Sequence, residues 1–223
     1  MTSRQLYTSS DLCELARGLY TEGAWVRRTL QVHRPRICPF EVLISSVPES
    51  ARILDIGCGS GLFLGLLAGS GRIVQGHGFD ASEDAIRLAN NMKARHTNGD
   101  CLEFTQRDVA DDWPEDHYDV VSVIDLLHHV PSGNQRSVIE EAVKRVKPGG
   151  ILIFKDMSAF PHPLAWASVL HDLVFARQWI NIVPYTSVKS WIEAAGFAET
   201  DHARINMYWY GHELGIFKRP ADS

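Results

Sequence analysis

The sequence predicts an α/β fold built on a doubly wound parallel sheet with a helical extension at its N-terminus. Three observations carry this prediction. From residue 52 onward, short β-rich runs alternate with amphipathic stretches of helical length, and this alternation is typical of right-handed βαβ units. The run VVSVI at 120–124 is apolar on both sides, as a strand covered by helices on both faces requires. A glycine-rich turn follows the first predicted strand, where such folds bind their ligands.

Local patterns give the expected elements in order. Strands are expected at 52–57, 72–80, 101–108, 120–124 and 151–157, with a closing pair at 199–206 and 208–219. Helices are expected at 9–20, 39–48, 61–71, 82–96, 132–146, 164–179 and 186–197.

Capping signals set the helix boundaries. Serines precede the first helix, and Glu83 and Asp84 stand in the first turn of the 82–96 helix, as the helix dipole favours. A capping box, Ser132-x-x-Gln135, is expected to open the next helix, whose apolar stripe would run to Val146 before KPGG ends it.

Composition and charge narrow the class of protein. The chain has 223 residues, of which 45% are hydrophobic and 22% charged, which is ordinary for one globular domain with a modest extension. A net charge of −5 gives no electrostatic reason to expect a nucleic-acid partner. The four cysteines form no CxxC pair, and no run of about 18 apolar residues occurs. We therefore expect a cytoplasmic monomer or homodimer without a metal or a membrane partner.

The glycine turn does not fit a dinucleotide-binding site. The stretch ILDIGCGSG at 53–61 places Gly57, Gly59 and Gly61 at alternate positions. The dinucleotide fingerprint G-x-G-x-x-G would need its third glycine where Leu62 stands. A different ligand is therefore expected.

Two carboxylates indicate the chemistry of that ligand. Asp55 lies just before the turn. A pyrophosphate binds to backbone N–H groups at a helix N-terminus without a negative charge nearby, so the carboxylate of Asp55 suits an ammonium group better. Asp80 ends the second strand 25 residues later, where its carboxylate can accept hydrogen bonds from both hydroxyls of a ribose. The competing interpretation of Asp80 is an N-cap for the following helix. We expect a nucleoside joined to an ammonium-bearing group, without phosphate.

Together with further motifs in register, these residues resemble class I S-adenosylmethionine-dependent methyltransferases. The motifs are RDV at 107–109, DLLHHVP at 125–131 and VKPGGILIFKD at 146–156. The resemblance covers residues 50–160 firmly. It implies a Rossmann-like seven-stranded sheet with an antiparallel last strand. We expect the methyltransferase domain at 50–223, preceded by a helical cap or extension at 1–49 that shares no motif with the family.

The resemblance implies S-adenosylmethionine as cofactor and gives each motif a role. The glycine turn would pass beneath the methionine part, and the end of the second strand would hold the ribose. Residues after the third strand would hold the adenine, and those after the fourth would lie near the sulfonium. In that order the residues are Asp55, Gly57, Cys58 and Gly59; Asp80 and Ala81; Asp108 and Val109; Asp125 and Leu126.

Candidates for catalysis lie in the fourth motif. His128 and His129 are the expected bases, because imidazole titrates near neutral pH. The alternative for either histidine is structural hydrogen bonding within the loop that joins strand to helix.

Candidates for binding the methyl acceptor lie farther along the chain. Lys155 and Asp156 end the fifth strand, where they can face the ligand crevice. His171 lies on the predicted 164–179 helix, and Tyr208 and Tyr210 would share one face of the last strand. Core packing is the alternative for all three.

These features predict an enzyme that methylates an oxygen or an activated carbon of a small, partly apolar metabolite, phenols included. The LLHHVP motif is similar to the branch that methylates quinones, phenols and lipid-like metabolites. Many amide and base N-methyltransferases instead carry [DN]PP[YF] where this chain has Asp125-Leu-Leu-His128. The alternatives are a small-molecule N-methyltransferase and a non-catalytic methyltransferase-like subunit.

Overall fold

The computed structural model describes residues 7–21, 25–158, 181–208 and 210–222, with the backbone alone at 26, 27 and 210. The strands in this part of the chain are β1 (Ala51–Ile56), β2 (Ile73–Asp80), β3 (Leu102–Gln106), β4 (Tyr118–Ile124), β5 (Val146–Met157), β6 (Ala198–Met207) and β7 (Tyr210–Lys218). The helices are α1 (Ser9–Leu19), α2 (Trp25–His33), α3 (Phe40–Ser46), α4 (Leu62–Gly69), α5 (Glu83–Lys93), α6 (Gln135–Lys144) and α8 (Tyr185–Ala194). Short 3₁₀ turns are η1 (Arg34–Arg36), η2 (Gly99–Cys101) and η3 (Leu127–His129).

The sheet has the predicted topology. Its seven strands hydrogen-bond in the order β3-β2-β1-β4-β5-β7-β6. β4 runs parallel to β1 and β5, and β7 runs antiparallel to β5 and β6. The predicted α/β, Rossmann-like fold with an antiparallel last strand is therefore confirmed. Within the described residues, no helix is long and apolar enough to cross a membrane.

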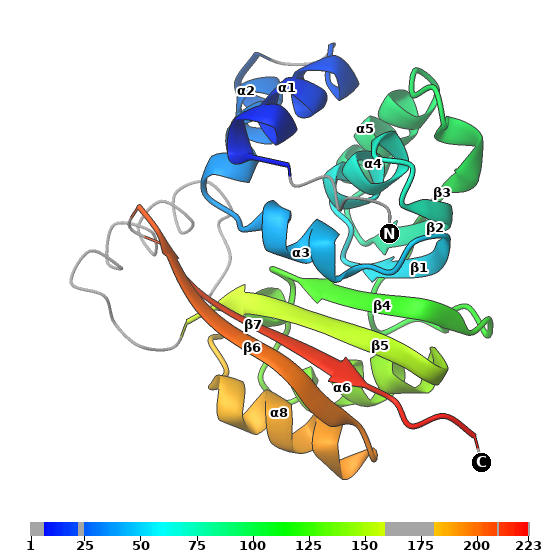
Figure 1. The fold of residues 1–223 in the computed structure, drawn as a ribbon, viewed down its shortest axis with the longest axis vertical. Helices are drawn as coiled ribbons and strands as arrows, with labels where there is room; N and C mark the ends of the chain where they lie inside the picture. Colours follow the sequence, from blue (N-terminus) through cyan, green and yellow to red (C-terminus); the bar gives the residue numbers. More distant parts are fainter. Residues whose placement is uncertain (1–6, 22–24, 159–180, 209, 223) are drawn as a thin grey trace, which may run out of the picture. The chain divides into compact units, whose positions relative to one another are not determined.

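The chain divides into two compact units. The first comprises residues 1–52 and 58–107, and the second comprises residues 53–57 and 108–223. In the first unit, α1 and α3 pack against α4, and α5 covers β2 and β3 (Figure 1). Every residue of α4 from Leu62 to Ala68 is buried, so this helix needs no polar face.

In the second unit, β4 forms the centre of the core. Val120, Val121 and Val123 are fully buried, as the run of apolar residues in the sequence predicted. α6 packs against β4 and β5, while α8 packs against α6, β6 and β7 (Figure 1).

One predicted helix cap and two predicted helix boundaries are wrong. The first helix is capped by Thr8 rather than by serine, since the Thr8 hydroxyl and the Asp11 carboxylate form a capping box. α6 begins at Gln135 after an Asn134 that makes no side-chain cap, so the predicted Ser132 box is absent. Val146 does not close α6 but opens β5, because the KPGG segment is accommodated as an irregularity in the β4–β5 pairing.

Candidate functional site

The first unit contains most of the glycine turn. Gly59 has a φ of +55°, and a Cβ added there would meet no atom within 4 Å. Its N–H donates to Asp80 Oδ2 at 2.9 Å, and the N–H of Cys58 donates to the carbonyl of Phe79 at 3.0 Å. The turn is thus tied to the end of β2. Glycine at 59 suits both the left-handed backbone and an open surface over which a ligand can pass.

Asp80 is a turn-organising carboxylate and not a helix cap. Its Oδ1 accepts the N–H of Ser82 at 2.9 Å, and its Oδ2 accepts that of Gly59. The N-cap of α5 is Ser82, whose hydroxyl accepts the N–H of Ala85. Since each carboxylate oxygen has two acceptor positions, Asp80 can also accept hydrogen bonds from a diol.

A residue that sequence reasoning missed braces this turn from α1. The hydroxyl of buried Tyr20 donates to the carbonyl of Ser60 at 2.7 Å, and burial raises the pKa of Tyr20 well above its usual value. Nothing in the local sequence signals this contact, because it joins residues 40 positions apart.

The other residues predicted to hold nucleoside lie in turns. The backbone carbonyl of Ala81 accepts from the Gln106 side chain at 3.3 Å. Asp108 is exposed, and its Oδ1 accepts the N–H of Ala110 at 2.9 Å. The carbonyl of Val109 accepts from the Trp113 indole at 3.1 Å. Asp108 therefore shapes its own turn, as short acidic side chains commonly do.

In the second unit, Asp55 is buried with a serine partner. Asp55 is 3% exposed, and the hydroxyl of Ser122 donates to its Oδ1 at 2.6 Å. The two residues are opposite each other in the β1–β4 register. Ser122 was missed at the sequence level, although a single polar residue within VVSVI was the available signal.

Gly57 and Leu126 lie against each other. Gly57 has a φ of +69°, and a Cβ there would come within 2.6 Å of a Leu126 methyl. A side chain at position 57 would therefore be strained by the left-handed backbone and would require Leu126 to shift.

Two ion pairs join the ends of β4 and β5. Asp125 follows β4 with a φ of +52°, and its carboxylate is bound by the ammonium of fully buried Lys155. The backbone N–H of Asp125 also donates to the carbonyl of Lys155 at 2.9 Å. Lys155 thus contacts both the side chain and the backbone of Asp125.

The second pair holds His128. Its ring Nδ1 contacts Asp156 Oδ1, and its backbone N–H donates to Asp156 Oδ2 at 3.1 Å. Burial alone lowers the pKa of His128, but the hydrogen bond and charge of Asp156 outweigh burial, so that pKa lies above its usual value. His129 is exposed, and its ring lies beside that of His128 with centroids 4.0 Å apart.

Gln135 anchors the turn that carries His128. Its side-chain amide donates to the carbonyls of Leu127, at 3.0 Å, and Asn181. The N–H of Asn181 in turn donates to the carbonyl of His128 at 2.8 Å. Gln135 was predicted as half of a capping box, and its position inside the second unit explains why that box does not form.

The described acceptor candidates lie in different settings. Lys155 and Asp156 are buried in the two ion pairs. Tyr208 lies in the β6–β7 turn with a φ of +56° and 69% exposure. Because the chain reverses between the paired residues Met207 and Tyr210, Tyr208 does not lie in the last strand, where it was predicted. His171 lies outside the described residues.

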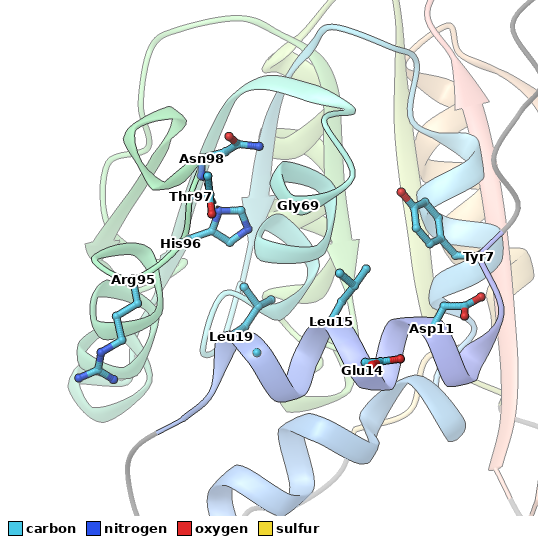
Figure 2. A pocket seen from close by; sticks show the side chains of 11 residues that line it. Tyr7, Asp11, Glu14, Leu15, Leu19, Gly69, Arg95, His96, Thr97 and Asn98 are labelled. Carbon is cyan, nitrogen blue, oxygen red and sulfur yellow. Dashed lines mark hydrogen bonds between the residues drawn. The ribbon is translucent and has the colours of Figure 1, made fainter.

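A groove of about 830 Å³ lies elsewhere in the first unit, between α1 and the loop after α5 (Figure 2). His96 and Asn98 line it, and both bond to the C-terminal part of α4. The His96 ring contacts the carbonyl of Gly65 at 3.1 Å, and the Asn98 amide donates to that of Ala68 at 2.8 Å. These side chains bond to carbonyls in the later part of α4. The glycine turn instead precedes the start of α4, so the groove is separate from that turn.

Comparisons with known proteins agree with this geometry. Residues 31–202 match a family model described as a methyltransferase domain. Ubiquinone biosynthesis O-methyltransferase of Hydrogenovibrio crunogenus is 33% identical over 137 residues, which cover 61% of this chain and 53% of that protein. The Coxiella burnetii protein of the same name is 26% identical over 179 residues, or 75% and 72% of the two chains. The chain spans about half the length of the first of these relatives.

Solved structures share the fold. An O-methyltransferase family protein from Burkholderia thailandensis superposes with a TM-score of 0.72 at 22% identity, over 88% of this chain and 59% of that one. Magnesium protoporphyrin IX methyltransferase from Synechocystis, bound to S-adenosylhomocysteine, gives a TM-score of 0.68 at 18% identity, over 92% and 93%.

Proposed function

The chain belongs to the methyltransferase domain family, whose model matches residues 31–202, and from that membership we propose an S-adenosylmethionine-dependent methyltransferase. It transfers the methyl group to an oxygen or an activated carbon of a small, partly apolar metabolite, phenols included. The observation that carries the proposal is the carboxylate of Asp80, which is bound by the N–H groups of Gly59 and Ser82 beside the open face of Gly59.

The described residues fit this cofactor. Asp80 retains acceptor positions for ribose hydroxyls, and the open face of Gly59 leaves space for the methionine part. Asp55 places a buried carboxylate at the end of the first strand, where an ammonium group would offset its charge. When bound, S-adenosylmethionine supplies a methyl carbon that its sulfonium already activates. The proposed cofactor residues are Asp55, Gly57, Cys58, Gly59, Asp80, Ala81, Asp108, Val109, Asp125 and Leu126.

For the acceptor, the protein contributes orientation and a base. Orientation of two reactants can supply roughly 7–11 kcal/mol of a barrier. The pairing of His128 Nδ1 with Asp156 leaves Nε2 as the nitrogen that would take a proton from a phenolic hydroxyl, while Asp156 would stabilise the imidazolium formed. His129, which is exposed, is the alternative base.

The names of the relatives support an oxygen acceptor. Curated relatives from Hydrogenovibrio crunogenus and Coxiella burnetii are both named as O-methyltransferases of ubiquinone biosynthesis. Transfer to an oxygen of an aromatic ring is therefore the first activity to test, and transfer to an amine is the second.

Methyl-labelled S-adenosylmethionine tests the proposal directly. The chain is incubated with a catechol, an aliphatic amine and a carboxylic acid, and label is counted in each. We expect label in the catechol; label in the amine alone would support the N-methyltransferase alternative. Binding of the cofactor without transfer to any acceptor, including a metabolite extract, would support the non-catalytic alternative.

Variants link the transfer to named residues. Asp80→Ala should weaken cofactor binding roughly 10- to 100-fold, because bonds to a charged group are lost. Asp100→Ala is the matched control, because Asp100 is an exposed aspartate in η2 of the same unit. His128→Gln should lower turnover by about 100-fold or more if the imidazole is the base, with cofactor affinity retained. A larger loss in His129→Gln would assign the base to His129 instead.

A further inference from the structure

One lysine occupies an unusual place at the end of β5. Lys155 is fully buried, and β4 and β7 flank it, with Ile124 and Leu214 as its register partners. Burying an ammonium group is strongly unfavourable unless a partner compensates it. The side chain therefore needs an anion, and Asp125 supplies one.

Asp125 in turn has a backbone that needs support. Its φ of +52° lies in the left-handed region, which is costly for a residue with a Cβ and which concentrates at functional sites. Lys155 contacts it twice, through the ammonium on the carboxylate and through a carbonyl that accepts the Asp125 N–H at 2.9 Å. Lys155 thus contacts both the backbone of Asp125 and its carboxylate.

Exposure separates the roles of the two residues. The side chain of Lys155 is 0% exposed, whereas that of Asp125 is 16% exposed. A bound molecule can touch the carboxylate and cannot reach the ammonium without displacing the strands around it. The earlier expectation that Lys155 contacts the methyl acceptor is therefore less well supported than a role through Asp125.

We infer that Lys155 is a positioning residue that holds Asp125 in its left-handed conformation, with the carboxylate directed toward the methionine end of the cofactor. This inference rests on the proposed function. Lys155 then contributes to the affinity for the cofactor and not to recognition of the acceptor.

A double-mutant cycle tests the inference with S-adenosylhomocysteine as the probe. Lys155→Met and Asp125→Asn should each weaken its binding by tenfold or more in calorimetry. The double variant should bind S-adenosylhomocysteine as well as the weaker-binding of the two single variants does, because a positioning residue acts through its partner. The KM for the acceptor should change little in Lys155→Met. Lys147→Met is the matched control, since Lys147 also lies on β5 and pairs with Asp119 of β4, but at a partly exposed position.

The outcomes separate the inference from the proposed function. If the wild-type chain does not bind S-adenosylhomocysteine, the proposed function itself fails. If it binds, equal affinity of Lys155→Met and Lys147→Met would overturn the inference, as would losses that multiply in the double variant. If Lys155→Met does not fold, the double variant, which removes both charges, and Asp125→Asn still test the inference. Unchanged affinity for S-adenosylhomocysteine in either variant would contradict a role for the Asp125 carboxylate.

Discussion

At the scale of single residues, the ends of the strands present carboxylates that are each held by a specific donor. Ser122 binds Asp55, and backbone N–H groups bind Asp80. Lys155 binds Asp125, and His128 binds Asp156. Asp55 and Asp156 are buried and need such partners, and Asp80 and Asp125 are partly buried. The fold therefore sets the direction of each of these side chains before any ligand arrives. Such preorganisation reduces the cost of ordering them on binding.

The His128–Asp156 pair makes a prediction about pH. Its folded pKa is raised above the unfolded value near 6.5, so its contribution to stability is fully present below pH 6.5 and is lost as pH rises through the folded pKa. His128→Asn should therefore lower the free energy of unfolding, measured with urea and compared with the wild type at the same pH, by more at pH 6 than at pH 9. An equal or larger loss at pH 9 would show that Asp156 does not favour the charged imidazole.

At the scale of elements, the strands could be predicted and some helix boundaries could not. Apolar runs such as VVSVI are local signals, and the buried β4 confirms them. Gln135 has the sequence context of a capping box, yet its amide instead bonds to carbonyls of two other segments. A pattern of neighbouring residues cannot reveal a partner such as Asn181, which lies 46 positions away.

This difference at α6 can be measured. Gln135→Leu should lower the free energy of unfolding by about 1–3 kcal/mol, because two hydrogen bonds from its amide, to the buried carbonyl of Leu127 and the partly buried carbonyl of Asn181, are lost. Ser132→Ala should change it by no more than about 0.5 kcal/mol, as expected for an exposed residue without a cap role. Chemical denaturation of both variants decides. A larger loss in Ser132→Ala would restore the capping box.

At the scale of the whole molecule, the sequence was sufficient for the fold and for the family, whereas the cofactor residues remain a prediction. Alternating strands and helices predicted the sheet, and the spacing of Asp55, Asp80 and the glycines predicted where a ligand would bind. The partners of these residues could not be predicted, since Ser122 and Tyr20 act across 67 and 40 positions. The placement of Tyr208 in a strand was wrong, because a tyrosine looks the same in a strand sequence as in the turn that Tyr208 occupies.

The proposed function depends most on a ligand that passes over the glycine turn. Gly59 and Gly71 belong to the same unit and both have a positive φ, +55° and +66°, with no atom within 4 Å of an added Cβ. Alanine at either position should lower stability by a similar amount, about 1–2 kcal/mol. Only at Gly59 would the new methyl group occupy the proposed cofactor surface.

Calorimetric titration of S-adenosylhomocysteine into the wild-type chain, Gly59→Ala and Gly71→Ala is the most direct test. We predict binding to the wild type with one site per chain, equal affinity in Gly71→Ala, and an affinity lower by about tenfold or more in Gly59→Ala, because one misplaced contact can cost about 1.4 kcal/mol. The absence of binding to the wild type, or equal affinities in the two alanine variants, would contradict the central claim that this turn holds the methyl donor.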